Sequence, residues 1–287
     1  MTALFALATS LLWGLADFGG GLLTRRIPAL TVVAVSQTLA VLVLGTIVLA
    51  TGAWTEAGPQ LWYAVGAGVV GPAAMLAFYK ALALGPMGVV SPLGSLGVVV
   101  PVSVGLLVGD RPGLLQLAGI AVAILGVVLA GGPELRGAPV QRQAVLLTLV
   151  AAFGFGSVMT LIAEASTTVT GLFLALFVQR VTNVLVGGGA LYASVRRGGR
   201  ALPEGGFAAV RAAVPALAFV GLADVAANGT YALAAQRGPV TVAAVLASLY
   251  PVVTALAARG ILKERLRAVQ AAGAGLALVG TVLLATG

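Results

Sequence analysis

Residues 109–119 read GDRPGLLQLAG and residues 263–273 read KERLRAVQAAG, so a similar charged phrase occurs twice in an otherwise apolar chain. Each phrase is followed by a further apolar run. Apolar matches arise easily by chance in a chain rich in Ala, Gly, Val and Leu, so the polar matches are the ones that indicate an internal repeat. At one constant spacing these are Asp110 with Glu264, Arg111 with Arg265, and Gln116 with Gln270.

The composition indicates a membrane protein. Hydrophobic residues make up 60% of the 287 residues and charged residues only 8%, against about 25% charged residues in a typical soluble domain. The formal net charge is +8, but the basic residues stand singly or in small groups between apolar stretches. This distribution is typical of loops that face the cytoplasm and anionic lipid, and it argues against a nucleic-acid partner.

The chain contains no cysteine and no histidine. Disulfides, thiol nucleophiles and histidine metal ligands are therefore excluded. The eight carboxylates form no acidic cluster of the kind that a membrane enzyme would need. We therefore expect no metal, no cofactor and no enzyme activity, and any coupling to protons has to use a carboxylate.

Ten stretches are long and apolar enough to cross a hydrocarbon core of about 30 Å as helices of about 20 residues. The first has no basic segment before Leu4, so it is expected to be a span rather than a cleaved signal peptide. Charge clusters and Gly-Pro pairs separate the predicted spans, which cover residues 3–23, 29–51, 59–84, 87–108, 112–131, 143–164, 170–194, 208–236, 239–258 and 266–286.

The repeated phrase introduces the fifth and the tenth span, so each repeat contains five helices. Because five is odd, the second repeat crosses the membrane in the opposite sense to the first. We predict an all-α integral membrane protein of ten transmembrane helices in two inverted five-helix repeats, residues 1–131 and 143–287, joined by a linker loop at 132–142. Lys and Arg gather in loops 1–2, 3–4, 5–6, 7–8 and 9–10, which places those loops in the cytoplasm and both termini outside.

The regions around the two phrases, residues 78–131 and 230–285, resemble the two halves of the EamA-type drug/metabolite transporter superfamily. Both contain an aromatic residue, Ala-Leu, Gly-Pro, a helix with Ser and Pro, an acidic residue with Arg, Gln, and two glycines separated by six residues. The first copy differs from the usual form because Asp110 stands in place of Glu and Pro101 lies further along its helix than Pro251.

This resemblance implies a secondary active transporter in the cell inner membrane that exports small organic metabolites, such as amino acids or drugs, by alternating access. Proton coupling is an open alternative. A lipid-linked sugar flippase or a facilitative uptake carrier of the same fold is the other interpretation. Because both halves are fused, we expect a functional monomer whose partners are a small-molecule substrate, the lipid bilayer and, if coupled, protons.

Asp17 is an acidic residue inside the first predicted span, where ionisable groups are costly and mark a pathway or a pair. Its surroundings resemble the acid-bearing first helix of small multidrug resistance transporters. Two interpretations follow: Asp17 is a proton or cation site, or it is an interface carboxylate paired with Arg25 or Lys80.

Arg180 lies near the middle of the seventh predicted span, beside Gln179 and Asn183. It is expected either to bind a substrate carboxylate or to form a structural ion pair, for which Asp224 is the best partner. In the eighth span Asp224, Asn228 and Tyr231 follow helical spacing on one face, which should point into the bundle. This face either lines the cavity or only packs between helices.

The first half offers Tyr79 with Lys80, and Ser91 with Ser95, as corresponding polar groups. Trp13 and Tyr250 are candidate aromatic walls, although such residues also serve as packing or interface anchors. We expect the cavity to be lined mainly by spans 1, 3, 6 and 8, with contributions from 2, 4, 7 and 9.

Overall fold

The computed structural model describes residues 1–24, 26–84, 94, 97, 99–109, 111–130 and 142–262, with 268–269, 272–273, 275–276, 279–280 and 283 near the carboxyl end. Every regular element within these residues is a helix. The all-α class predicted from the sequence is therefore confirmed.

The helices of the first half begin and end close to the predicted spans. They are α1 Thr2–Thr24, α2 Ala29–Thr51, the 3₁₀ helix η1 Ala53–Glu56, α3 Leu61–Leu84, α5 Val99–Leu107 and α6 Leu114–Ala130. α2 is followed by Gly52, whose φ of 67° is the left-handed conformation that favours glycine after a helix. Of the predicted fourth span, residues 94, 97 and 99–108 are described.

The helices of the second half are α7 Arg142–Glu164, α8 Val169–Arg196, α9 Gly206–Ala212, α10 Val214–Gln236, α11 Val240–Ala247 and α12 Tyr250–Leu262. Thr168 begins α8 as an N-cap, because its hydroxyl accepts a hydrogen bond from the backbone N–H of Gly171 at 3.0 Å. Most of the predicted tenth span lies outside the described residues, as do Asp110, Glu264 and Gln270 of the repeated phrases.

Two predicted spans are wrong as single helices, because proline interrupts each of them. The span predicted at 208–236 is divided at Ala213 into α9 and α10, with Pro215 in the first turn of α10. The span predicted at 239–258 is divided at Ser248 and Leu249, just before Pro251. Proline lacks a backbone N–H and its ring clashes with the carbonyl four residues earlier, which favours a break at these two points, although α3 continues through Pro72.

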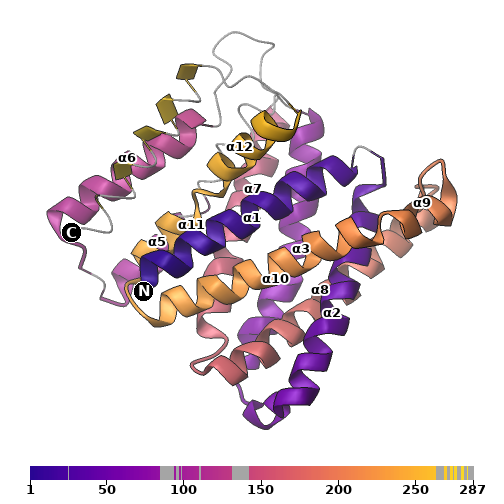
Figure 1. Ribbon diagram of the computed structural model, residues 1–287, viewed down its shortest axis with the longest axis horizontal. Helices are drawn as coiled ribbons and strands as arrows, with labels where there is room; N and C mark the ends of the chain where they lie inside the picture. The colour runs from indigo at the N-terminus through magenta and orange to yellow at the C-terminus, as the bar shows by residue number, and fades with distance from the viewer. Residues whose placement is uncertain are drawn as a thin grey trace.

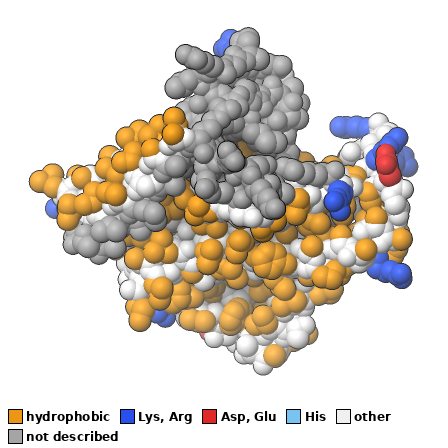
Figure 2. Space-filling model, turned by 45° about the horizontal axis from the view of Figure 1, so that its top comes forward, with side chains coloured by type: hydrophobic (Ala, Val, Ile, Leu, Met, Phe, Trp, Pro, Cys, Tyr) orange, Lys and Arg blue, Asp and Glu red, His pale blue; other side chains and the backbone are white. Residues whose placement is uncertain are grey.

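The surface of the bundle is suited to contact with lipid. Within the described part of the chain, six helices, α1, α2, α3, α7, α8 and α10, are long and apolar enough to cross a membrane. Large side chains such as Trp62, Phe153 and Leu185 are 74, 68 and 69% exposed. Figure 2 shows apolar side chains over much of this face, with basic groups toward its margins. A soluble protein rarely exposes apolar area of this extent.

The long helices lie side by side (Figure 1). Each of the following contacts between helices has an equivalent contact when the helices of one half are replaced by their counterparts in the other half. α1 packs on α10 and α7 packs on α3, while α2 packs on α8. α2 also contacts α10 and α8 contacts α3; α1 contacts α11, and α7 contacts α5. Exchanging α1 with α7, α2 with α8, α3 with α10 and α5 with α11 therefore reproduces this set of contacts.

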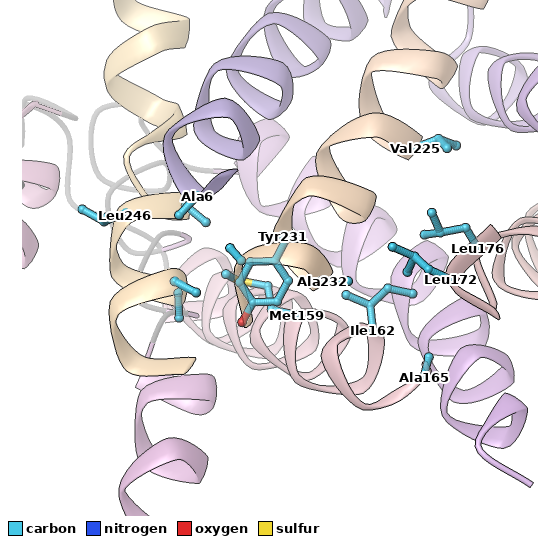
Figure 3. Close-up of a cluster of buried hydrophobic side chains, with 14 of the residues drawn as sticks. Ala6, Met159, Ile162, Ala165, Leu172, Leu176, Val225, Tyr231, Ala232 and Leu246 are labelled. Atoms are coloured by element: carbon cyan, nitrogen blue, oxygen red, sulfur yellow. The ribbon is translucent and has the colours of Figure 1, made fainter. Parts of the chain in front are cut away.

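The interior is filled by small side chains around one large aromatic residue. Figure 3 shows Tyr231 of α10 beside Met159 of α7, between Ala6 and Ile162. Glycine allows the closest approach of α1 to α12, because a Cβ at Gly14 would lie 2.5 Å from the Cβ of Val253. Small residues at such contacts are what let membrane helices pack closely.

Candidate functional site

Four helices bring polar side chains together inside the bundle. α1 contributes Trp13, α2 contributes Gln37, α8 contributes Arg180 and α10 contributes Asp224. None of the four stands in the first or last turn of its helix. The cluster is therefore at a depth where polar groups need partners from protein.

An ion pair between Arg180 and Asp224 is the centre of this cluster. Arg180 Nη1 lies 2.8 Å from Asp224 Oδ2. Arg180 is 2% exposed, whereas the side chain of Asp224 is 26% exposed. An unpaired guanidinium in a membrane interior is costly, so the carboxylate stabilises Arg180 in its buried position. The pairing predicted from the sequence is present.

Three neutral side chains complete the bonding of the Asp224 carboxylate. Oδ1 accepts hydrogen bonds from Trp13 Nε1 at 3.2 Å and from Asn228 Nδ2 at 3.1 Å. Oδ2 accepts from Gln37 Nε2 at 3.1 Å, in addition to Arg180. Gln37 bridges the pair, since its Oε1 also accepts from Arg180 Nη1 at 2.9 Å. The carboxylate is thus held by donors from α1, α2, α8 and α10.

Asn183, one turn beyond Arg180 on α8, ties the cluster to α3. With its amide turned so that donors face acceptors, its nitrogen donates to the carbonyl oxygen of Gly68 at 2.8 Å. Its side-chain oxygen then accepts from Arg180 Nη1 at 3.0 Å. Asn183 is 7% exposed, so this orientation satisfies a buried amide on both sides.

Several buried polar atoms have no hydrogen-bond partner among the described residues. Arg180 uses only Nη1, which leaves Nε and Nη2 without an acceptor. Nε and Nη2 form one edge of the planar guanidinium, the arrangement that binds a carboxylate through two parallel hydrogen bonds. The other unpartnered atoms are Gln179 Oε1, Asn228 Oδ1 and the Tyr231 hydroxyl.

Asp17 lies one turn beyond Trp13 on α1 and its side chain is exposed. It interacts electrostatically with Asp224 and with Tyr250. Within the described part of the chain, no hydrogen bond or ion pair involves its carboxylate. The alternative partners named from the sequence, Arg25 and the side chain of Lys80, lie outside the described residues.

Two tyrosines surround Trp13. Its ring centroid lies 6.1 Å from that of Tyr231 and 6.2 Å from that of Tyr250, and the second pair is T-shaped. Tyr231 is fully buried, whereas Trp13 and Tyr250 are partly exposed. Trp13 therefore joins the aromatic group to the charged pair through its N–H.

The structure changes the predicted membership of the site in two ways. The cluster is built by α1, α2, α8 and α10, which are spans 1, 2, 7 and 8, so spans 2 and 7 contribute more to it than expected, while a cavity lined mainly by spans 1, 3, 6 and 8 stays a prediction. Gln37 belongs to the cluster but was not among the candidate residues named from the sequence. The sequence feature that could have identified Gln37 is an amide side chain within an otherwise apolar predicted span.

Tyr79, Lys80, Ser91 and Ser95 cannot be compared with the site, because their side chains lie outside the described residues. Asn228 and Tyr231 are buried, 2% and 0% exposed, on the inner face of α10. Among the residues that the structure describes, no three acidic side chains come together as a metal site.

A buried ion pair inside a bundle of apolar, membrane-length helices defines a polytopic membrane protein with a charged centre. The chain belongs to the EamA-like transporter family, whose model matches residues 1–132 and again residues 142–286. The protein is thus a multi-pass membrane transporter of two repeats.

A solved structure described only as "Crystal structure of protein" has the same fold as this chain. It superposes with a TM-score of 0.75 at 19% sequence identity, and the match covers 98% of this chain and 95% of that one. At this identity the likeness shows the fold alone. None of the curated proteins compared with the chain matches it.

Proposed function

We propose that this family member is a secondary active transporter that exports small organic metabolites, such as amino acids or drugs, by alternating access. The observation that carries the proposal is the buried pair of Arg180 and Asp224, held 2.8 Å apart by four helices from both repeats. Charged residues inside a membrane bundle are costly, and they mark substrate and ion pathways. The midplane between two repeats is where transporters of this kind bind substrate.

The proposed arrangement is ten transmembrane helices in two inverted repeats, residues 1–131 and 143–287 with a linker at 132–142.

Contacts between loops at the two ends of the bundle support the inversion of the second repeat. Thr31, at the start of α2, donates to the carbonyl oxygen of Ala201 beyond α8 at 2.5 Å, so loops 1–2 and 7–8 share one end. η1 packs on α8 near its start, so loops 2–3 and 6–7 share the other. Equivalent loops 1–2 and 6–7 thus lie at opposite ends.

The two ends of the bundle differ in how tightly they are closed. Near the start of α1, Thr9 and Thr230 are hydrogen-bonded at 2.9 Å and the guanidinium of Arg237 lies 5.0 Å from the Phe5 ring. Toward the other end of α1, Asp17 is exposed and Asp224 is partly exposed. The accessible carboxylates are therefore nearer the end that carries loops 1–2 and 7–8, which the excess of basic residues predicts to be cytoplasmic. Loading from the cytoplasm fits an exporter.

The charges of the site favour a substrate with both a cationic and an anionic group, or a cation alone. Among the described residues, Asp17 and Asp224 against Arg180 leave one negative charge without a counter-ion, which suits an ammonium group beside the aromatic rings of Trp13 and Tyr250. The unpartnered Nε and Nη2 edge of Arg180 offers two donors to a carboxylate. Gln179 Oε1, Asn228 Oδ1 and the Tyr231 hydroxyl are further buried polar atoms of α8 and α10 that have no partner among the described residues.

A ligand screen tests the assigned site. Purified protein is heated with amino acids, organic cations or sugars, and the same compounds are offered to proteoliposomes. We expect one class to raise the melting temperature and to be transported, and Arg180→Gln or Asp224→Asn to abolish both effects. Arg142→Gln, which removes an exposed arginine at the start of α7, is the matched control and should keep them. A thermal shift that survives in both site variants would overturn the assignment.

Proton coupling is proposed to use Asp17, because its carboxylate is exposed and no hydrogen bond or ion pair from the described residues holds it. A facilitative carrier of the same fold would transport without a proton gradient.

The proposed location is the cell inner membrane, with the basic loops in the cytoplasm. We propose that the chain works as a monomer without a cofactor, because both repeats and the charged cluster between them belong to one polypeptide. Mass measurement of the purified protein in micelles tests this: a stable dimer that loses transport on dissociation would contradict it.

A further inference from the structure

A shallow apolar pocket opens on the side of the bundle between α2, α3 and α8. Its walls include Ala29, Leu30 and Val33 of α2, Pro72 and Met75 of α3, and Gly187 of α8. Leu76, which also lines it, is 37% exposed. The pocket therefore opens toward the apolar surroundings of the bundle.

Gly187 contributes to the width of this pocket. A Cβ at this position would meet only the Cγ1 of Val33, at 3.9 Å. A larger side chain at position 187 would thus extend into the pocket instead of clashing with backbone. All of the lining residues are apolar, so the pocket suits hydrocarbon and offers no polar partner.

Basic residues gather at the end of the bundle nearest this pocket. Within residues 196–211 the acidic side chain of Glu204 is outnumbered by arginines. Figure 2 shows basic side chains grouped over the end where α9 lies in Figure 1. The exposed arginines of this basic end are Arg26, Arg196, Arg197, Arg200 and Arg211.

The chain connects the pocket directly to the basic end. Arg26 precedes Ala29, the first residue of α2 and a wall of the pocket. Arg196 lies nine residues beyond Gly187 on α8, or about 14 Å at about 1.5 Å per residue. The hydrogen bond between Thr31 and Ala201 fixes the loop after α8 against the start of α2. Arg26 and Arg196 therefore stand within about 15 Å of the pocket along the helix axes.

We infer that the pocket and the basic end together form a binding site for an anionic phospholipid. The arginines hold the headgroup phosphate, and one acyl chain lies in the pocket against α2, α3 and α8. Tyr192 and Phe207, 66 and 70% exposed at the same end, are of the type that anchors a protein at the membrane interface. The ring of Tyr192 also supports the guanidinium of Arg196, 5.9 Å from its centroid.

A defined site differs from the general attraction of basic loops to anionic lipid. Diffuse attraction depends on the number of arginines alone, at about 1 kcal/mol for each basic residue near the surface. The site inferred here depends also on the shape of the pocket. It does not require that the protein transport anything, so it stands or fails separately from the proposed function.

Native mass spectrometry of the full chain, released from micelles containing phosphatidylglycerol or phosphatidylcholine with identical chains, tests the inference. We expect wild-type protein to retain phosphatidylglycerol at least about fivefold more tightly than phosphatidylcholine. This factor corresponds to a difference of about 1 kcal/mol in binding free energy. Arg197→Gln/Arg200→Gln should remove this preference. Arg111→Gln/Arg142→Gln, which removes two exposed arginines that are not among the five of the basic end, should keep it.

The pocket is tested with Gly187→Leu and, in case that variant fails to fold, with Ala29→Leu. Both should weaken phosphatidylglycerol retention as strongly as loss of the arginines does, while Gly187→Ala should leave it nearly unchanged. The inference would be overturned if lipid retention depended only on the number of arginines and was unchanged in the pocket variants. Equal retention of the two lipids by the wild-type protein would overturn it as well.

Discussion

Arg180 and Asp224 stabilise one another, so removing either charge leaves the other without its main partner. Replacing Arg180 with Gln should lower the free energy of unfolding by about 3 kcal/mol, the lower end of the range for a broken buried pair. The lower end applies because the side chain of Asp224 is 26% exposed and is partly screened. Unfolding in one detergent, followed by circular dichroism, measures this change.

The double variant Arg180→Gln/Asp224→Asn checks the reason for that loss. Because both charges are removed together, it should be more stable than Arg180→Gln alone. Additive losses from the two single variants would show that the pair contributes no coupling energy.

At the level of residues, the sequence was sufficient to select the charged centre. Arg180, Asp224, Asn228 and Tyr231 stand out because each is a polar group inside an apolar run. The sequence could not show that Gln37 bridges the pair, since an amide in a span does not reveal which neighbouring helix it faces. It also could not decide between the interpretations of Asp17, because these depend on exposure and on contacts in space.

The helices contain glycines that differ in how much space surrounds them, and only the crowded ones allow two helices to approach closely. A Cβ at Gly221 of α10 would overlap the backbone carbonyl of Ser36 on α2, whereas nothing lies within 4 Å of a Cβ at Gly189 on α8. Gly221→Ala should therefore destabilise the protein by about 1–3 kcal/mol through overpacking. Gly189→Ala should be neutral or stabilising by up to about 1 kcal/mol, because alanine favours the helix.

Thermal unfolding of both alanine variants in the same detergent measures this difference. Equal effects of the two substitutions would contradict the close approach of α2 and α10.

At the level of elements, hydropathy located the spans but not the breaks within them. The breaks at Ala213 and at Ser248 arise from proline geometry, which an average over apolar residues does not register. Span edges such as the start of α3 at Leu61 differ by only two residues from the prediction at 59, because charge and Gly-Pro signals mark them locally.

The whole molecule is predicted to cross the membrane so that equivalent loops of the two repeats face opposite sides. Because the chain has no cysteine, single cysteines report their side of the membrane without interference. A cysteine replacing Glu204 should react with an impermeant maleimide only after the cells are opened. Cysteines replacing Ala57 or Thr167 should react in intact cells.

Labelling of Glu204→Cys and Ala57→Cys from the same side would contradict the inverted arrangement. The two-repeat organisation itself was available from the sequence, because the polar residues of the repeated phrase keep their spacing. The orientation of the repeats came from an odd count of five spans in each. That count rests partly on segments outside the described residues, so the labelling experiment is an independent measure.

Transport in proteoliposomes tests the central claim most directly. With a substrate identified by the ligand screen, wild-type protein should accumulate it against its gradient when a pH gradient is imposed, and should exchange it when both sides are at equal pH. Asp17→Asn should keep exchange but lose accumulation, because the carboxylate that takes up the proton is gone. Gradient-driven accumulation by Asp17→Asn equal to that of the wild type would contradict the account.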